Sequence, residues 1–307
     1  MSRSRVPASS TRAWRVRASR VAVLATLALV TACSGGGGPE PSATSATSAT
    51  SATPSSSPMT DTPSATAGPT SEPIEVTAYF LAETPLGPRL VSEVLVAEGD
   101  PLEAAVAAML AGPGDDDTRS EWNPATRVLG VSREGDEIVV DLSDEARAAS
   151  VSPDEAALMV QQLVYTVTGA ANDPEAAVRL LIDGGPPGTL WGAVEWDSAV
   201  TRADPREVRA LVQILSPLEA EQVTSLEVTV SGEAAGSTVL WVVRTAAGAE
   251  VASGTAMVED VDSGLGVFAF VVPLPPGRYV VEVSEDPSAA EGEPMSDDRR
   301  FSVHLAA

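Results

Sequence analysis

The residues suited to chemistry are few and widely separated in this sequence of 307 residues. It contains one cysteine, Cys33, and one histidine, His304. Asp141, Ser143 and Asp183 lie at the ends of predicted strands, a common place for catalytic groups, but their part of the chain has no histidine or cysteine. A Ser–His–Asp or Cys–His arrangement is therefore excluded there. Turn formation and capping are the favoured roles, a carboxylate pair is the weaker alternative, and we expect no enzyme activity.

Two acidic loops raise the question of a metal site. Asp115, Asp116 and Asp117 are adjacent, and residues 259–264 have the sequence EDVDSG. EF-type calcium loops space their ligands at alternate positions and add a glycine and a distal glutamate, and neither loop provides that whole set. His304, on the last predicted strand, has no second histidine or cysteine to complete a zinc set. We predict solvated turns, with weak cation binding as the alternative, a solvent-facing His304 and no cofactor.

The N-terminal segment has the pattern of an export signal. Six arginines and no acidic residue precede the apolar run Val21–Cys33, VAVLATLALVTAC. A positively charged segment before a short apolar run is typical of a secretory signal peptide, whereas a membrane-spanning helix needs about 20 apolar residues. Retention as a transmembrane helix is therefore the weaker interpretation.

The end of that run, Val30-Thr31-Ala32-Cys33, resembles a bacterial lipobox, in which an aliphatic residue and two small residues precede the cysteine. The resemblance implies that residues 1–32 are a lipoprotein signal peptide and that Cys33 is the lipidation site. Each buried acyl methylene contributes about 0.8 kcal/mol, so two or three fatty acyl chains such as palmitate anchor a protein durably. We therefore expect a lipid anchor at Cys33 on the extracytoplasmic face of the cell membrane. An ordinary signal peptide with an incidental cysteine is the alternative.

The charge of the chain restricts its partners. The sequence has 19 basic and 43 acidic residues, a net charge of −24. Removal of the leader with its six arginines leaves 13 basic residues, all arginine, and a net charge of −30. Nucleic acid and anionic lipid surfaces are bound by basic patches. The mature chain is therefore predicted to bind no nucleic acid and to be held at the membrane by its anchor.

Composition divides the mature chain into a stalk and two folded domains. Residues 34–73 are almost entirely Ser, Thr, Ala, Gly and Pro, with the repeat SATSATSAT, a composition that cannot bury enough apolar surface to fold. With Cys33 they form a predicted disordered stalk over 33–73, whose typical span is on the order of 35 Å. Helical and strand patterns alternate over 74–203, and only strand patterns follow over 204–307.

Two helices are predicted in the first domain. Asp100, followed by proline, has the preferences of an N-cap, and Gly112 is placed to end that helix. Ser152 and Glu155 have the spacing of a capping box for a second helix, and Gly169 is placed to end it. The predicted apolar stripes are Leu102, Val106, Met109 and Leu110 in the first helix and Ala156, Val160, Leu163, Val164 and Val167 in the second.

Strand patterns surround these helices. The predicted strands are IEVTAYFLA, RLVSEVLVA, RVLGV, EIVVDLS and AVRLLIDGG. The last is continuously apolar and is expected inside the sheet.

Four motifs occur in order in this domain: DPLEAAVAAMLAGP, RVLGVSREGDEIVVDLS, EAALMVQQLVYTVTG and VRLLIDG. Together they resemble the GerMN domain of sporulation and spore-germination proteins and of envelope lipoproteins, over roughly Ile74 to Trp196. The resemblance implies a small α/β domain with two helices packed on a mixed sheet, and a role in building or stabilising an envelope assembly. The family has no established catalytic residues to transfer.

The second domain has the pattern of an all-β sandwich. Seven short strand patterns separated by Gly, Pro, Asp and Ser turns occupy about 100 residues. Trp241 is the expected core aromatic, although the cysteine pair of antibody domains is missing. Ser216-Pro217, the strand VTVSGEA and the hairpin VLWVVRTAAGAEVASG resemble the immunoglobulin-like domain of bacterial spore germination. The predicted fold class is α+β, with a small mixed-sheet domain of two helices followed by an immunoglobulin-like sandwich.

These features favour a non-enzymatic, membrane-anchored envelope lipoprotein that acts as a protein-interaction module. Its expected partner is another envelope protein or a second copy of itself. The alternative is a solute- or cation-binding lipoprotein that works with a transporter, against which stands the missing two-lobed α/β pattern of such receptors.

Overall fold

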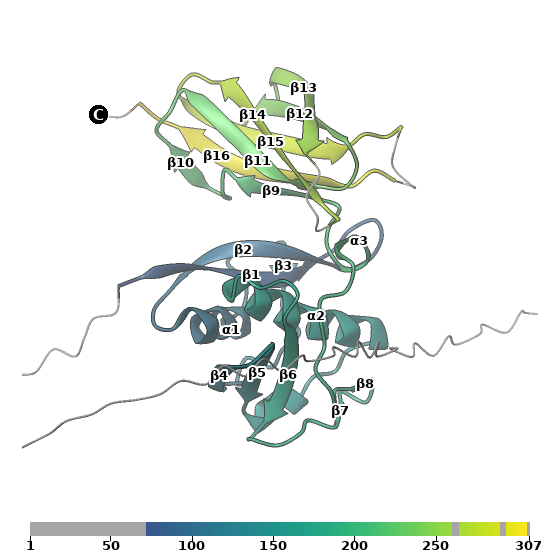
Figure 1. The fold of residues 1–307 in the computed structure, drawn as a ribbon. Helices are drawn as coiled ribbons and strands as arrows, with labels where there is room; N and C mark the ends of the chain where they lie inside the picture. The colour runs from purple at the N-terminus through teal and green to yellow at the C-terminus, as the bar shows by residue number, and fades with distance from the viewer. Residues whose placement is uncertain (1–71, 260–263, 289–292, 306–307) are drawn as a thin grey trace, which may run out of the picture. The chain divides into compact units, whose positions relative to one another are not determined.

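The computed structural model describes residues 72–259, 264–288 and 293–305 (Figure 1). The predicted signal peptide, the predicted lipidation site Cys33 and the predicted stalk up to residue 71 lie outside these residues. One compact unit spans Ala65–Ala307, and every element named below belongs to it. Within the described ranges, no helix has both the length and the apolar character that crossing a membrane requires.

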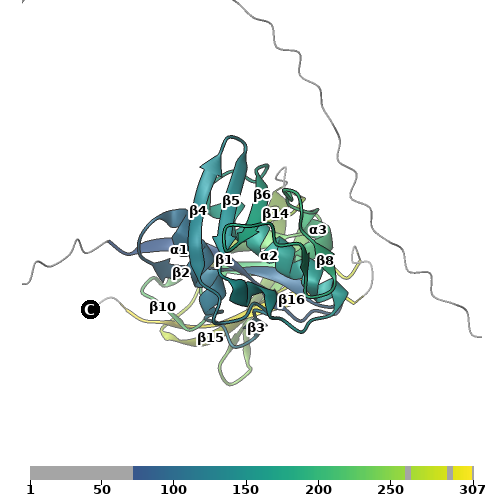
Figure 2. The same cartoon turned by 90° about the horizontal axis from the view of Figure 1, so that it is seen from below.

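The first folded region is built from short strands and two long helices. Its elements are β1 (Ile74–Ala82), β2 (Arg89–Ala97), α1 (Pro101–Ala111), β3 (Thr118–Arg119), β4 (Val128–Glu134), β5 (Glu137–Leu142), the 3-10 helix η1 (Asp144–Arg147), α2 (Pro153–Ala170), β6 (Ala177–Ile182), β7 (Thr189–Leu190) and β8 (Val194–Glu195). One sheet is antiparallel, in the order β2-β1-β3. A second, mixed sheet has the order β4-β5-β6, with β5 and β6 parallel (Figure 2). The fold class is α+β, as predicted, and the strands are divided among these two sheets and an antiparallel two-stranded sheet of β7 and β8.

The two helices lie between the sheets (Figure 1). Alternation along each strand turns one face toward the helices, and the helices bury their predicted stripes, apart from Leu102, which is partly buried. The resulting core contains Phe80, Met109, Ile138, Val140, Met159, Leu163, Leu180 and Trp196. Since full burial of a large aliphatic or aromatic side chain contributes about 1.5–3 kcal/mol, this layer is the main source of stability for the region.

Both predicted helix starts are confirmed. The Asp100 carboxylate accepts hydrogen bonds from the backbone N–H groups of Leu102, at 3.0 Å, and Glu103, at 3.4 Å. The Ser152 hydroxyl accepts from the Glu155 N–H at 3.3 Å, and the Glu155 carboxylate accepts from the Ser152 N–H at 3.0 Å. This second arrangement is a complete capping box.

The predicted end of α2 at Gly169 is wrong. The helix continues to Ala170, and Asn172 takes the left-handed conformation at φ 51°. The Asn172 N–H donates to the Gly169 carbonyl and the Asp173 N–H to the Thr168 carbonyl, each at 3.0 Å, which is the Schellman pattern. Asparagine tolerates this conformation better than other residues with side chains, so it replaces the expected glycine.

The prediction that AVRLLIDGG lies inside the sheet is also wrong. β6 is the outermost strand of its sheet, and burial alternates along it, with Arg179 exposed and paired with Glu137. Beyond its edge, Val178 and Val200 exchange two backbone hydrogen bonds of 2.8 Å. One buried face is enough to explain the apolar residues of the strand.

The second folded region is a β-sandwich whose strands form one continuous hydrogen-bonded order, β10-β16-β15-β12-β13-β14-β11-β9 (Figure 1). Its elements are α3 (Pro205–Val208), β9 (Val212–Ser216), β10 (Glu221–Val223), β11 (Glu227–Ala234), β12 (Thr238–Thr245), β13 (Glu250–Glu259), β14 (Gly266–Pro273), β15 (Gly277–Glu285) and β16 (Ser296–Val303). β13 connects the two halves because it pairs with β12 and, at its end, with β14. The seven predicted strands are present, and the short elements α3 and β10 were not predicted.

The core of this second region departs from prediction at one aromatic residue. Trp241 is only partly buried and stacks on Phe270, with ring centroids 4.5 Å apart. The fully buried aromatic side chain is Phe268. Opposite it, a Cβ on Gly232 would lie 2.1 Å from the Gln213 carbonyl oxygen, so only glycine allows β9 and β11 to approach at that position.

Candidate functional site

The three residues considered for catalysis have structural roles. Asp141 accepts a hydrogen bond from the Gly184 N–H at 3.0 Å, and Asp183 has a positive φ of 50° in the same turn. Ser143 is buried, and its hydroxyl accepts from the Arg127 N–H at 3.0 Å. The Asp141 and Asp183 positions fit the predicted role in turns, whereas the Ser143 side chain makes no cap hydrogen bond to η1 and links that position to Arg127 instead.

The acidic loop 115–117 closes on itself. The Asp115 carboxylate accepts from the Asp117 N–H at 2.9 Å, and the Asp115 carbonyl accepts from the Thr118 N–H at 3.2 Å. In residues 72–259, 264–288 and 293–305, no group of three or more His, Cys, Asp or Glu side chains is arranged to hold a metal ion. The second acidic loop, residues 259–264, lies mostly outside the described residues.

His304 is exposed, as predicted, but follows the last strand instead of lying on it. β16 ends at Val303 and lies between β10 and β15, so it is not an edge strand. The His304 ring contacts the Ser302 hydroxyl at 3.1 Å. Cys33, the predicted lipidation site, lies outside the described residues, and its role stays a prediction.

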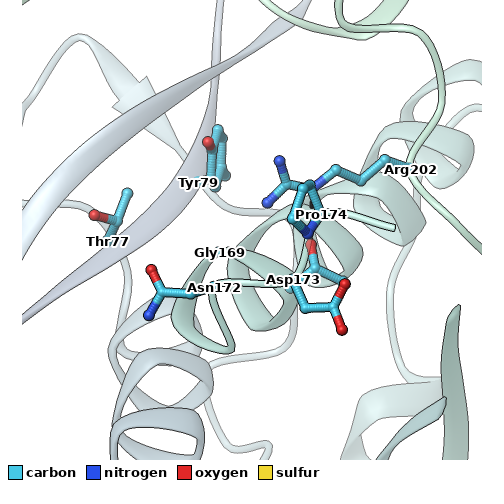
Figure 3. Close-up of a pocket in the computed structure, with 8 residues that line it drawn as sticks. Thr77, Tyr79, Gly169, Asn172, Asp173, Pro174 and Arg202 are labelled. Carbon is cyan, nitrogen blue, oxygen red and sulfur yellow. Dashed lines mark hydrogen bonds between the residues drawn. The ribbon is translucent and has the colours of Figure 1, made fainter. Parts of the chain in front are cut away.

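A hollow of about 370 Å³ lies beside the end of α2 (Figure 3). We call it the Arg202 hollow. β1 contributes Thr77 and Tyr79, the Schellman turn contributes Asn172 and Asp173, and the chain after β8 contributes Arg202. Figure 3 shows the guanidinium pointing toward Tyr79, and the Asp173 carboxylate pointing away from both β1 residues.

The Arg202 guanidinium is held in place by contacts with α2. Its Nε donates to the Thr168 hydroxyl at 2.7 Å and its Nη2 donates to the Tyr165 carbonyl at 3.2 Å. The guanidinium also lies over the Tyr165 ring, 4.5 Å from its centroid, an attractive cation–π arrangement. Because Thr168 is completely buried and donates in turn to the Val164 carbonyl at 2.6 Å, the position of the guanidinium is fixed by α2.

Arg202 keeps its positive charge in the hollow without a carboxylate partner among the described residues. No carboxylate of the described residues forms an ion pair with Arg202. Burial lowers the pKa of Arg202 from its ordinary value, and arginine nonetheless stays charged at neutral pH. Burial also raises the pKa of Tyr165 to about 12, so its hydroxyl stays protonated and donates to the Ala203 carbonyl at 2.7 Å.

A strand edge is the second feature that can take part in binding. β2 is the outermost strand of its sheet, and Glu93–Ala97 pair only with β1 among the described strands. Val94 and Val96 on this segment are 43% and 75% exposed. We call residues 93–97 the β2 edge. Most proteins protect such an edge with charge, proline or a covering element, so an apolar uncovered edge is suited to strand addition by a partner.

Comparison with family models supports the resemblances inferred from the motifs. Residues 77–187 match the Germane family, described as sporulation and spore germination. Residues 211–293 match the Gmad2 family, described as the immunoglobulin-like domain of bacterial spore germination. Both predicted resemblances are confirmed. We refer below to the GerMN-like region and the immunoglobulin-like region.

Solved structures similar to this chain carry related descriptions at low similarity. The tandem GerMN domains of the sporulation protein GerM from Bacillus subtilis are 14% identical, with a TM-score of 0.35, and the match covers 43% of this chain and 45% of that one. The first GerMN domain of the same protein is 17% identical, with a TM-score of 0.29, over 41% of this chain and 97% of that one. A putative lipoprotein from Clostridium perfringens is 17% identical, with a TM-score of 0.31, over 45% and 93%. A comparison with curated proteins gave no match.

Sequence reasoning missed the Arg202 hollow. Tyr79 and Thr77 belong to a strand that was recognised, but strand periodicity does not indicate a hollow beside it. Asn172 follows a helix whose end was predicted at Gly169, one residue before its observed end at Ala170. Arg202 lies in a segment without regular structure, and the one available signal was an arginine with no acidic residue within three positions before it in a very acidic chain.

Proposed function

We propose that this protein is a non-enzymatic envelope lipoprotein, anchored through Cys33 on the extracytoplasmic face of the membrane, whose folded regions bind another envelope protein. The observation that carries the proposal is the succession of a GerMN-like and an immunoglobulin-like region behind the predicted lipobox. The structural contacts of Asp141 with Gly184 and of Ser143 with Arg127 support this proposal.

The β2 edge is the surface that best fits this role. Strand addition would satisfy its outward backbone groups and cover Val94 and Val96. Self-association is the less favoured occupancy, because two mature chains of charge −30 repel each other. The favoured partner therefore presents an apolar strand with a neutral or basic surround.

Cross-linking in intact cells tests the interaction. A photoreactive residue at Val96 should capture an envelope protein, and the same residue at Met257, which is 77% exposed on the immunoglobulin-like region, should not. Capture of the chain itself would support self-association instead. The proposal would be contradicted if cross-linking at Val96 captured no envelope protein and no second copy of the chain, and if the fragment 65–307 were monomeric.

Cell fractionation tests the anchor. The Cys33→Ala variant should leave the membrane fraction or accumulate with its leader uncleaved, because no thioether can form. A variant that stays fully membrane-bound and is cleaved at the same place would overturn the assignment of Cys33. The alternative function, solute or cation binding with a transporter, stays a prediction, and a defined calcium stoichiometry in a calorimetric titration would favour it.

A further inference from the structure

We infer that the Arg202 hollow binds the carboxylate group of a small ligand or of a peptide end. This site is distinct from the β2 edge, and the inference does not depend on anchoring or on a protein partner. It rests on the remaining donors of Arg202, on the polar groups around it and on the charge of its surroundings.

The guanidinium has unused donors directed at one side. A guanidinium carries five N–H donors, and two of these are used internally, by Thr168 and the Tyr165 carbonyl. Nη1 and the second N–H of Nη2 thus remain at the outer end of the group, with no acceptor among the described residues. Two parallel donors at that end match the two oxygens of a carboxylate.

Other polar groups of the hollow also have unused hydrogen-bonding capacity. Within the described residues, the side chains of Thr77 and Asn172 and the hydroxyl of Tyr79 make no hydrogen bond. They border the same space as the guanidinium (Figure 3). A ligand that carries an amide or hydroxyl group next to its carboxylate would use them together. Acylated amino acids and acidic sugars both have this arrangement.

The two nearby carboxylates do not compensate Arg202. Asp173 lines the hollow but pairs with Arg133. Glu233, the carboxylate with a small effect on the Arg202 pKa, pairs with Arg209. The chain has a net charge of −24, yet the Arg202 guanidinium is fixed in position without a carboxylate partner. It is therefore suited to bind the carboxylate of a ligand.

Nuclear magnetic resonance on the fragment 65–307, which corresponds to the compact unit, tests the inference. The probes are N-acetylalanine and its neutral analogue N-acetylalaninamide, and glucuronate and its neutral analogue glucose. We expect saturable shifts of the Gly169 and Asn172 amides with at least one acid and none with its neutral analogue. Tighter binding of N-acetylalanine would identify a peptide end as the source of the carboxylate, and tighter binding of glucuronate an acidic sugar.

Variants separate recognition from folding. Arg202→Gln should weaken binding of the acid by about tenfold or more, because a paired charge is lost. Arg179→Gln, at an exposed position of β6, is the matched control and should bind normally. If Arg202→Gln does not fold, the variants Asn172→Gly and Thr77→Val test the inference instead. Glycine keeps the left-handed conformation of the turn at position 172, and valine keeps the shape of the Thr77 side chain, while each variant removes a polar group. Each should weaken binding of the acid several-fold.

Three results would overturn the inference. The first is equal binding of an acid and its neutral analogue. The second is a set of shifts away from Gly169 and Asn172, or the absence of saturable shifts with both acids. The third is unchanged affinity in Arg202→Gln, or, where that variant is unfolded, in both Asn172→Gly and Thr77→Val.

Discussion

The GerMN-like and immunoglobulin-like regions differ in how the backbone groups at the edges of their strands are hydrogen-bonded. In the immunoglobulin-like region, each strand from β10 to β9 is hydrogen-bonded to its neighbours in the strand order, and apolar side chains fill the space between the two halves of the sandwich. In the GerMN-like region, much of one edge of β1 faces α2, and side chains of the helix bond to the strand backbone. The Tyr79 N–H donates to the Thr166 hydroxyl at 3.0 Å, and the Tyr79 carbonyl accepts from the Gln162 amide at 2.8 Å.

This difference explains why α2 is buried on more than one side. Gln162, Thr166 and Thr168 are completely buried although all three are polar. A helix between two sheets must bury opposite faces, and a strand edge without a neighbouring strand needs side-chain partners for its backbone groups. Gln162 and Thr166 therefore satisfy backbone groups of β1 that strand pairing satisfies in the other region.

The largest expected effect is on the apolar core of the immunoglobulin-like region. Phe268→Ala should lower the free energy of unfolding by about 3–5 kcal/mol, because it leaves a cavity between the sheets. Phe270→Ala is the matched control, since Phe270 is only partly buried, and should cost clearly less. Urea unfolding measures both. Equal losses in the two variants would show that the partly buried stack on Trp241 contributes as much as the core.

A smaller loss is expected when the polar link of the GerMN-like region is broken. Thr166→Val keeps the shape of the side chain but leaves the buried Tyr79 N–H without an acceptor, which costs about 1–3 kcal/mol. Thr255→Val, at an exposed position of β13, is the control and should change stability little. Hydrogen exchange of the Tyr79 amide should accelerate in Thr166→Val alone. An unchanged stability would mean that β1 does not depend on α2 for its backbone partners.

The same contrast separates what could be predicted from sequence from what could not. Strand periodicity and cap residues predicted the starts of α1 and α2 and the longer strands of both regions, because these depend on neighbours in sequence, whereas the short strands β3, β7, β8 and β10 were not predicted. The burial of Gln162 and Thr166 could not be predicted, since only the position of α2 beside β1 makes a polar residue suitable there. That Phe268 and not the predicted Trp241 lies at the centre of the sandwich could not be predicted either, because it depends on the contact of Phe268 with Gly232 on the neighbouring strand.

Loss of a helix cap in the GerMN-like region should have a still smaller effect. Ser152→Ala removes the hydroxyl of the capping box and should cost about 1 kcal/mol at neutral pH. The Ser152 backbone and hydroxyl lower the pKa of Glu155 from its ordinary value of 4.5. The part of this stabilisation that comes from the hydrogen bond of the Ser152 hydroxyl to the Glu155 carboxylate is therefore complete above that value and lost as the pH falls through the folded-state pKa. The hydrogen bond from the Glu155 N–H to the Ser152 hydroxyl does not depend on pH. Ser132→Ala, exposed on β4, is the control, and a cost of Ser152→Ala that does not decrease in strong acid would contradict this explanation.

The smallest effect we expect is a pH slope of opposite sign in the immunoglobulin-like region. The Asp297 carboxylate accepts hydrogen bonds from the Ile214 N–H and from Arg299, each at 2.7 Å. Burial raises the pKa of Asp297 above its ordinary value of 3.8. The positive charge of Arg299 opposes this shift, and the negative charge of Asp298 adds to it. A raised folded-state pKa means that the folded state binds the proton more tightly, so stability should decrease as the pH rises from 3.8 through the folded-state value. Subtracting the unfolding curve of Asp297→Asn from that of the unchanged protein isolates this slope, and Asp298→Asn serves as the control. A difference that grows with rising pH would show that the pair with Arg299 outweighs burial, and that the two regions respond to acid alike.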